Sequence, residues 1–346
     1  MQTAVPIARE AEALPQPYLL FLGDITEPGY AKTAFGLRDW APEHCVGEWA
    51  CAGTTVSTGL PMIGPAEARR RGARSMVIGV ATPGGQVPEA WLPMLIEALA
   101  AGLDLVGGMH ARLDGIDALR MAASAHGRRL HDVRHPPEDL PVASGRRRSG
   151  RRLLTVGTDC AVGKKYTALA LVRAFCERGI DADFRASGQT GILIAGRGMP
   201  MDAVVADFAA GAAELLSPDA APSHWDVIEG QGALSHPAYA GVSLALLHGS
   251  QPDVVVVCHE HGRERALGFP RFALPSIEET IDLALRLGAR TNPGIRCAGV
   301  SLNTARLDAD AAHAVIEDAA ARLALPVADP IRGGDALARL VEACLA

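Results

Sequence analysis

The stretch at residues 155–167, "TVGTDCAVGKKYT", carries the pattern of a phosphate-binding loop. An apolar run precedes it, Gly157 and Gly163 lie inside it, and Lys164 begins an apolar segment with helical spacing. A strand, a glycine-containing turn and a helix start place backbone N–H groups around one point, where they stabilise an anion. The stretch therefore predicts phosphate binding. The alternative, a Gly-Lys helix start without a ligand, fits the strand-loop-helix context less well.

The loop departs from the common pattern in two ways. Five residues, not four, separate Gly157 from Gly163, and Lys165 stands where a Ser or Thr normally binds magnesium. A protonated lysine cannot bind a metal, and Thr167 lies about 200° further round the helix, where it is poorly placed to substitute. We therefore expect that the loop holds phosphates without transferring them and that no metal is tightly bound. Coenzyme A is a ligand of this kind. The predicted cofactor-binding residues of the loop are Thr158, Asp159, Cys160, Ala161, Val162, Gly163, Lys164, Lys165 and Tyr166.

Polar side chains follow several other apolar runs, at the points where strands are expected to end. Because ligands of open α/β sheets bind beyond the carboxyl ends of strands, these side chains should converge on one crevice. Burying an unpaired carboxylate is costly, so Glu229, at a strand tip, is expected to be functional. Asp202 and Asp207 are weaker candidates, and Asp202 suits a helix N-cap equally well. The polar residues of these strand ends include Arg185, Ser187, Gln189, Thr190, Glu229, Gln231, His236, His248, His259 and Asn303.

The elements that must position these residues alternate between strand and helix patterns. In the first half, apolar strand-like runs occur at residues 18–24, 75–81 and 103–110, with helical spacing at 89–102. The second half restarts the alternation at residue 152, with further strands expected at 182–187, 225–230, 253–260 and 295–303. Strands separated by single helices imply parallel sheets. The sequence predicts an α/β protein of two domains: a Rossmann-like one (residues 1–140) and a P-loop NTPase-like, doubly wound one (152–346).

Residues 141–151 interrupt this alternation and are predicted to be a basic linker. Five arginines fall within residues 146–152, among prolines and Ser-Gly pairs. A solvated connector is the favoured interpretation, because the flanking domains are not basic. A nucleic-acid-binding arm and a set of arginines facing an anionic ligand are the alternatives. The net charge of −6 and the pI of about 6.0 argue against a general nucleic-acid binder.

The composition favours a cytoplasmic protein. Seven cysteines show neither a CxxC pair nor zinc-ligand spacing, which is typical of reduced thiols. The first twenty residues show no export signal, and no apolar run reaches the roughly 18 residues of a membrane span. Apolar surface and an alanine-rich terminal helix suggest a homo-oligomer, and the other expected partners are small molecules, with neither nucleic acid nor membrane among them.

Four segments occur in the order found in the dethiobiotin synthetase branch of P-loop proteins: "GTDCAVGKK", "SGQTG", "IEGQG" and "SLN". The chain resembles that branch, which also has five residues between its loop glycines but a threonine at the position of Lys165. The resemblance implies nucleotide and metal binding by Lys164, Glu229 and Asn303. Lys165 counts against magnesium-ATP chemistry. The resemblance leaves open an alternative function, that of an ATP- and magnesium-dependent ligase or carboxylase.

Longer segments resemble another family over nearly the whole chain. They are "YLLFLGDITEPGYAKTAFGLRDWAPEHCVGE", "HGRRLHDVRHP", "RLLTVGTDCAVGKKYTALAL", "ADFRASGQTGILIAGRG" and "DVIEGQGALSHPAYAGVSLALLHGSQPD". These look like the DgcN family, D-glutamate N-acetyltransferases of bacterial D-amino-acid catabolism that use acetyl-CoA. The resemblance implies this activity and leaves open whether other D-amino acids are also substrates. The family pattern also has two adjacent lysines, in agreement with a loop that holds coenzyme A phosphates.

Acetyl transfer to an amine needs an anchored acetyl donor, a neutral amine and donors for the carbonyl oxygen. Arg185 is the expected clamp for the substrate carboxylate, because its guanidinium is cationic and fork-shaped. Glu229 or His236 would accept the ammonium proton, and both remain open. Direct transfer is favoured over an acetyl-Cys160 intermediate, which a lowered thiol pKa in a positive loop would support. The predicted substrate-binding residues are Arg185, Ser187, Gln189, Thr190, Gln231 and His248.

Two further functions are less well supported. A nucleotide- or coenzyme A-sensing module without catalysis does not explain the dense polar groups at several strand ends. A dehydrogenase would need GxGxxG after the first strand, where the chain has "LGDITEPG" instead. The "TPGG" turn at residues 82–85 could still contact part of a ligand. The stereochemical preference for the substrate stays open.

Overall fold

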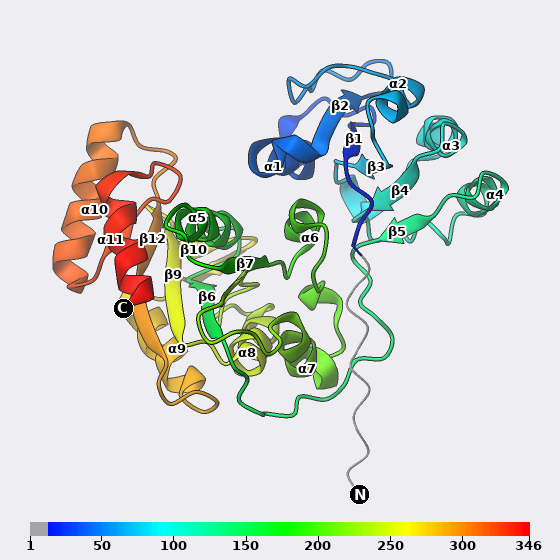
Figure 1. Ribbon diagram of the computed structural model, residues 1–346. Coiled ribbons are helices and arrows are strands. Elements are labelled where there is room, and N and C mark those ends of the chain that lie inside the picture. The colour runs from blue at the N-terminus through cyan, green and yellow to red at the C-terminus, as the bar shows by residue number, and fades with distance from the viewer. Residues whose placement is uncertain (1–12) are drawn as a thin grey trace, which may run out of the picture. The chain divides into compact units, whose positions relative to one another are not determined.

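The computed structural model describes residues 13–346, which fold as two compact units (Figure 1). The N-terminal unit contains residues 13–136 and 189–203, and the C-terminal unit contains residues 137–188 and 204–346. Residues 1–12, within which most of the stretch lacking an export signal falls, lie outside the described residues. Over the described part of the chain, no helix combines the length and apolar character needed to cross a membrane.

The N-terminal unit is a five-stranded parallel sheet with the order β2-β1-β3-β4-β5, which confirms the predicted Rossmann-like domain. The strands are β1 (Tyr18–Phe21), β2 (Cys45–Trp49), β3 (Ser75–Ile78), β4 (Asp104–Gly107) and β5 (Leu130–Asp132). The helices of the first part of the chain are α1 (Lys32–Trp40), α2 (Pro65–Arg70), α3 (Leu92–Ala100) and α4 (Asp117–Ala125). Every residue of β1 is buried, as expected for a central strand covered on both faces.

A hollow of about 390 Å³ lies in this unit beyond the carboxyl ends of β1 and β3. Strand order reverses between these two strands, which is where open α/β sheets bind ligands. Its lining includes the carboxylates of Asp24 and Glu27, and no described lysine or arginine. The expectation that no dinucleotide binds in this unit stays a prediction.

Helix α6 (Gln189–Ala195) belongs to the N-terminal unit, although it follows β7 (Ala182–Arg185) of the other sheet. Tyr18 donates a hydrogen bond from Oη to the carbonyl oxygen of Leu193 at 3.1 Å, and the Oγ1 atoms of Thr33 and Thr190 lie 3.2 Å apart. Residues 189–203 therefore belong to a different unit from the one predicted, in which residues 152–346 form a single domain. The apolar spacing of a helix shows which face is buried but not which sheet that face covers.

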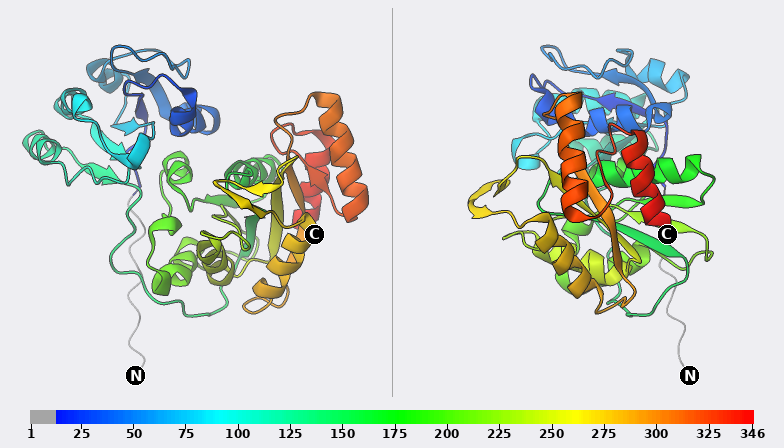
Figure 2. Two further views of the ribbon diagram at one scale, coloured as in Figure 1. Left: turned by 180° about the vertical axis from the view of Figure 1, so that it is seen from behind. Right: turned by 90° about the vertical axis from the view of Figure 1, so that its left-hand side faces the viewer.

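The C-terminal unit is a six-stranded parallel sheet with the order β13-β12-β9-β6-β8-β7, which confirms the predicted doubly wound P-loop-like domain. Its strands are β6 (Arg151–Gly157), β7 (Ala182–Arg185), β8 (Trp225–Ile228), β9 (Val254–Glu260), β12 (Arg296–Asn303) and β13 (Val327–Ala328). An antiparallel hairpin of β10 (Arg265–Ala266) and β11 (Phe269–Ala273) follows β9 (Figure 2).

Helices cover both faces of this sheet. They are α5 (Lys164–Glu177), α7 (Ala206–Leu216), α8 (Ala240–Ser250), α9 (Ile277–Gly288), α10 (Ala309–Leu323) and α11 (Gly334–Leu345). Phe175 of α5 packs in one core cluster with Leu340 and Val341 of the alanine-rich helix α11. Because α11 buries its apolar face inside its own unit, that face gives no support for an oligomer.

The basic segment is anchored in the C-terminal unit at two arginines, contrary to the expected exposed connector. Arg148 donates from Nε to the carbonyl oxygen of Ser217 and from Nη2 to that of Gly249, both at 2.7 Å. Arg152 is fully buried and donates from Nη2 to the carbonyl oxygen of Ser149 at 2.8 Å. Burial lowers the pKa of Arg148 to about 10. Both side chains donate to backbone carbonyl groups, Arg148 at the ends of α7 and α8, so they belong to the packed interior of the unit.

Replacing Gly230 by Ala should destabilise the C-terminal unit by about 2–3 kcal/mol, because overpacking a filled site displaces the backbone. A Cβ atom at Gly230 would lie 1.7 Å from the carbonyl oxygen of Thr155. Gly241 in α8 has open space around its Cβ position, so Gly241→Ala should leave stability unchanged or raise it by up to about 1 kcal/mol. Urea unfolding of both variants measures the difference, and equal stabilities would contradict the packing described for the strand tip.

Candidate functional site

The loop between β6 and α5 lies at the carboxyl edge of the C-terminal sheet, where strands β6, β8, β9 and β12 end. Gly163, which precedes α5, has φ of 110°, a backbone conformation that glycine adopts without strain. Lys164 is buried, and its Nζ donates to the carbonyl oxygen of Asp159 at 2.7 Å. Burial lowers the pKa of Lys164, and the nearby carboxylates and thiols oppose this shift. The loop thus combines a helix N-terminus with a buried ammonium group.

Lys165 is the second ammonium group of the loop. Burial lowers its pKa, and the carboxylate of Glu229 raises it. Its Nζ lies 4.6 Å from the centroid of the Tyr166 ring, where a cation is attracted by the ring face. The whole chain has only three lysines among its 33 lysines and arginines, and two of them are adjacent here. A compact ammonium group is the charge that fits a narrow buried loop.

Glu229 follows β8 and is almost fully buried. Its Oε2 accepts hydrogen bonds from the backbone N–H groups of Ser187 at 3.0 Å and Gly188 at 3.1 Å. Ser187 donates from Oγ to the carbonyl oxygen of Glu229, and Gln231 donates from Nε2 to Ser187 Oγ at 3.0 Å. Burial raises the pKa of Glu229, while Lys165 and the two N–H groups lower it. The structure therefore brings together Glu229, Ser187, Gln231 and the charge of Lys165.

Asp159 fixes the other side of the loop to the β10–β11 hairpin. Its Oδ1 accepts from its neighbour, the backbone N–H of Cys160, at 2.7 Å. Its Oδ2 accepts from the N–H of Leu267 at 2.8 Å and from Arg263 Nη1 at 3.2 Å. The carboxylate is fully buried, so these bonds replace the water that it loses. Asp159 is thus a structural anchor rather than a group that reaches out to a ligand.

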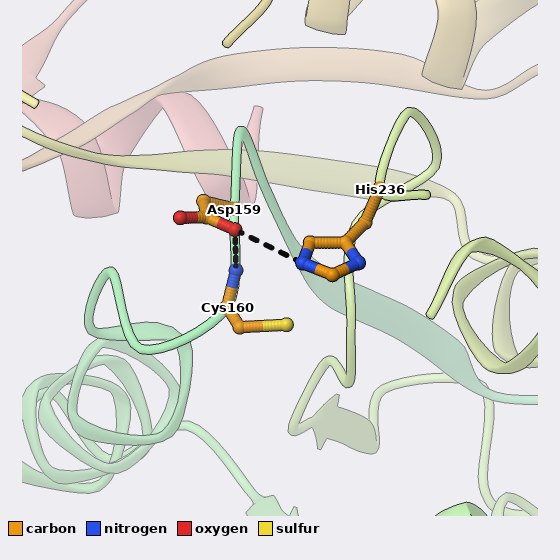
Figure 3. Close-up of side chains that lie close together, drawn as sticks. All are labelled: Asp159, Cys160 and His236. Carbon is orange, nitrogen blue, oxygen red and sulfur yellow. Dashed lines mark hydrogen bonds and ion pairs between the residues drawn. The ribbon is translucent and has the colours of Figure 1, made fainter. Parts of the chain in front are cut away.

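His236 lies beside Asp159 and Cys160, as Figure 3 shows. Its Nδ1 accepts from the backbone N–H groups of Ala238 and Tyr239 at 3.1 and 3.2 Å. Its Nε2 lies 3.6 Å from Asp159 Oδ1, beyond hydrogen-bond distance. One oxygen, sulfur or nitrogen atom from each of Asp159, Cys160 and His236 lies within 4.8 Å of the others. This cluster contains the ligand types of a transition-metal site.

The thiol of Cys160 is not activated by the loop. Burial raises its pKa and Asp159 adds to this, while Lys164 and Arg263 oppose it. The expectation of a lowered thiol pKa is therefore wrong, because desolvation of the thiolate outweighs the positive charges nearby.

Several of the predicted site residues lie outside the cluster of Asp159, Cys160 and His236. The Arg185 guanidinium lies 2.5 Å from Oδ1 of the buried Asp226, back along the sheet from the carboxyl edge, and so it forms a partly buried ion pair. His248 lies in the last turn of α8, where Nε2 contacts the carbonyl oxygen of Leu287 at 3.1 Å. Gln189 and Thr190 belong to the N-terminal unit.

Asn303 ends β12 at the carboxyl edge, but its Oδ1 accepts from the backbone N–H of Ala305 at 3.0 Å. The amide oxygen therefore closes a turn. His259 is the penultimate residue of the neighbouring strand β9, and its Nδ1 lies 2.9 Å from Thr158 Oγ1, so it contacts the loop directly. Burial lowers the pKa of His259, and the charges of His261 and Arg263 add to this.

The residues that sequence reasoning missed are on the β10–β11 hairpin and before it. Arg263 binds the Asp159 carboxylate and donates from Nη1 to the carbonyl oxygen of Cys160 at 2.7 Å. The ring of Phe269 packs edge-on against His236 with centroids 5.1 Å apart. No local motif marks either residue, and their only signal is a cluster of arginines directly after the β9 strand pattern.

Comparisons with known proteins cover both units. The model of DUF1611, described as a domain of unknown function with a P-loop domain, matches residues 141–341, and that of DUF1611_N, described as a Rossmann-like domain, matches residues 43–136. A D-glutamate N-acetyltransferase from a Pseudoalteromonas species is 48% identical over 318 residues, covering 92% of this chain and 96% of that protein. Another D-glutamate N-acetyltransferase, from Tritonibacter scottomollicae, is 48% identical over 330 residues, covering 95% and 98%. The crystal structure of a DUF1611 family protein from Anabaena variabilis is similar with a TM-score of 0.82 at 33% identity, covering 95% of this chain and 99% of that one.

Cys160 should react slowly with iodoacetamide at neutral pH, because only the thiolate is the nucleophile and burial raises the pKa of this thiol. Cys176 is exposed and serves as the internal reference. Peptide mapping by mass spectrometry over a time course should show Cys176 modified first, by about tenfold or more. Faster modification of Cys160 would mean that the loop activates the thiol.

Proposed function

This chain belongs to the DUF1611 family, and we propose that it is an N-acetyltransferase that transfers the acetyl group of acetyl-CoA to the amine of D-glutamate. The main support for this proposal is the 48% identity to two D-glutamate N-acetyltransferases over nearly the full length of all three chains. The amine nitrogen attacks the thioester carbonyl carbon, the carbon–sulfur bond breaks, and the amine gives up a proton as the coenzyme A thiol leaves.

The proposal assigns the phosphates of acetyl-CoA to the loop at residues 157–164. Backbone N–H groups at the start of α5 and the ammonium groups of Lys164 and Lys165 supply positive potential there. The Lys165 ammonium group faces the charge of Glu229, where a P-loop of the common pattern has a magnesium-binding hydroxyl. In this proposal the ammonium groups take the place of the metal, and the phosphates are held without being transferred.

Glu229 is the proposed acceptor of the amine proton. Burial raises its pKa, which makes the carboxylate a stronger base than an ordinary exposed one. The pantetheine arm separates the thioester from the phosphates, so Glu229 can serve the reacting amine only when that arm bends back toward the loop. The role of Glu229 as base is therefore tested separately from the phosphate assignment, through the kcat of a Glu229 variant.

The carboxylate clamp is proposed to involve Ser187 and Gln231, which adjoin Glu229. Arg185, the clamp expected from the sequence, would first have to leave Asp226 uncompensated in the interior, which is costly. Arg185 therefore holds β7 against β8 in this proposal.

A ligase or carboxylase that uses magnesium and ATP is the alternative function. Its magnesium would have to bind beside the Lys165 ammonium group, which repels it. The cytoplasmic location and the homo-oligomeric state stay predictions. Exposed apolar side chains at Tyr239, Leu267 and Phe272 offer surface for a second copy.

Acetyl-CoA and D-glutamate, incubated with the protein in EDTA, should release free thiol at a rate proportional to protein, and N-acetylglutamate should appear in equal amount. The acetyl donor supplies the leaving group, so neither ATP nor magnesium is needed. A thiol reagent and mass spectrometry follow the two products. ADP release from magnesium-ATP without thiol release would instead support the ligase.

Glu229→Gln should lower kcat by about 100-fold, the usual contribution of a general base. Because burial raises the pKa of Glu229, wild-type kcat should fall with decreasing pH already above the ordinary carboxyl range, as the base becomes protonated. The variant should lack this acid limb, and Glu177→Gln, at an exposed residue of α5, should keep it. A raised KM for acetyl-CoA with unchanged kcat would show that Glu229 organises the phosphate site and is not the base.

A further inference from the structure

We infer that His236 is a fixed hydrogen-bond donor, whose Nε2–H binds a phosphate oxygen of the ligand held by residues 157–164. The inference rests on the proposed phosphate-binding role of the loop, but not on the identity of the acetyl acceptor. It assigns His236 a role different from the proton acceptor that the sequence suggests.

The hydrogen bonds of the ring assign its tautomer. Nδ1 faces the N–H groups of Ala238 and Tyr239, which directly precede α8. Two N–H donors require a lone pair on Nδ1, so the proton of the neutral ring is on Nε2. The ring orientation is fixed as well, because Tyr239 stacks on it at 4.8 Å and Phe269 packs edge-on at 5.1 Å.

The Nε2–H group has no hydrogen-bond acceptor among the described residues. The His236 side chain is only 1% exposed, and the nearest carboxylate oxygen, Oδ1 of Asp159, is 3.6 Å away. A buried donor without a partner is costly, and such groups in native proteins commonly serve a ligand. Nε2 is directed at Asp159 and Cys160 of the loop that is proposed to hold the phosphates (Figure 3). An oxygen of the anion is therefore the acceptor that fits.

The same tautomer argues against two other roles. A general base needs a lone pair on Nε2, which would place the proton of the neutral ring on Nδ1, against two N–H donors. A metal-binding histidine donates its second ring N–H to an acceptor, whereas Nδ1 of His236 accepts. Asp159, the second candidate ligand, is already paired with Arg263. The cluster of Asp159, Cys160 and His236 is thus better suited to an anion beside it than to a metal within it.

The tautomer can be measured directly on the full-length protein by ¹⁵N NMR of labelled histidines. The chain has 11 histidines, and the spectrum of His236→Gln identifies the resonances of His236. We expect the neutral ring to carry its proton on Nε2 and none on Nδ1, and we expect the Nε2 resonance to shift when coenzyme A or inorganic pyrophosphate is added. A proton on Nδ1 alone, or an Nε2 resonance that neither addition moves, would overturn the inference.

Two variants separate the donor from the rest of the ring. Glutamine places its side-chain N–H donor near the position of Nε2, whereas the shorter asparagine places its amide oxygen near the position of Nδ1 and its N–H donor does not reach the position of Nε2. His236→Asn should weaken coenzyme A binding by about tenfold, the range for a hydrogen bond to a charged group, and His236→Gln should bind more nearly like wild type. Calorimetry measures the affinities, and circular dichroism checks that both variants fold. Equal affinities of His236→Asn and wild type would overturn the inference.

Zinc provides the remaining control. After equilibration with zinc and buffer exchange, the wild-type protein should retain no more metal than His236→Asn. Stoichiometric zinc that depends on His236 and Cys160 would overturn the donor role in favour of a metal site. A protein that passes these tests but does not acetylate D-glutamate would contradict the proposed function alone.

Discussion

Burial of opposite charges at one edge of a sheet is the constraint on which the site depends. Lys164, Lys165 and Glu229 all lose water there, and desolvation shifts each pKa toward the neutral form. Their mutual attraction opposes these shifts and favours the charged forms. A phosphate bound there, as proposed, would add negative charge beside the two lysines and so would stabilise the ammonium groups that burial destabilises. An anion in the loop would in this way offset the cost of burying the two lysines.

The surrounding structure holds these charges in place through backbone groups. Ser187 and Gly188 donate to Glu229, and Leu267 and Cys160 donate to Asp159. The carboxylates therefore receive fixed dipoles in place of mobile water, which is how a site is organised before its ligand arrives. The β10–β11 hairpin belongs to this arrangement, because it contacts the loop through Asp159. The same distribution of donors leaves the Nε2–H of His236 directed at the loop.

The features that sequence analysis predicted are those encoded locally. The loop is recognisable because its strand, glycines, lysines and helix are contiguous, and Glu229 because an acid directly follows a buried strand pattern. The features it missed depend on contacts distant in sequence. Arg185 carries a charge suited to a substrate, but Asp226, 41 residues away, pairs with it. Arg148 and Arg152 were expected to be part of a solvated basic segment, yet they donate hydrogen bonds to carbonyl groups about 65–100 residues away. The sequence also did not predict which sheet α6 covers, since an apolar helix face does not specify the surface on which it packs.

The central claim is that ammonium groups hold the phosphates of coenzyme A where a common P-loop uses magnesium. The most direct measurement is calorimetric titration of coenzyme A and of ATP into wild type and Lys165→Thr, each in EDTA and in magnesium. Threonine restores the metal-binding hydroxyl of the common pattern. The account predicts that wild type binds coenzyme A equally well in both buffers, and that Lys165→Thr loses this binding by about tenfold or more. Coenzyme A binding that requires magnesium in wild type, or that Lys165→Thr leaves unchanged, would contradict it.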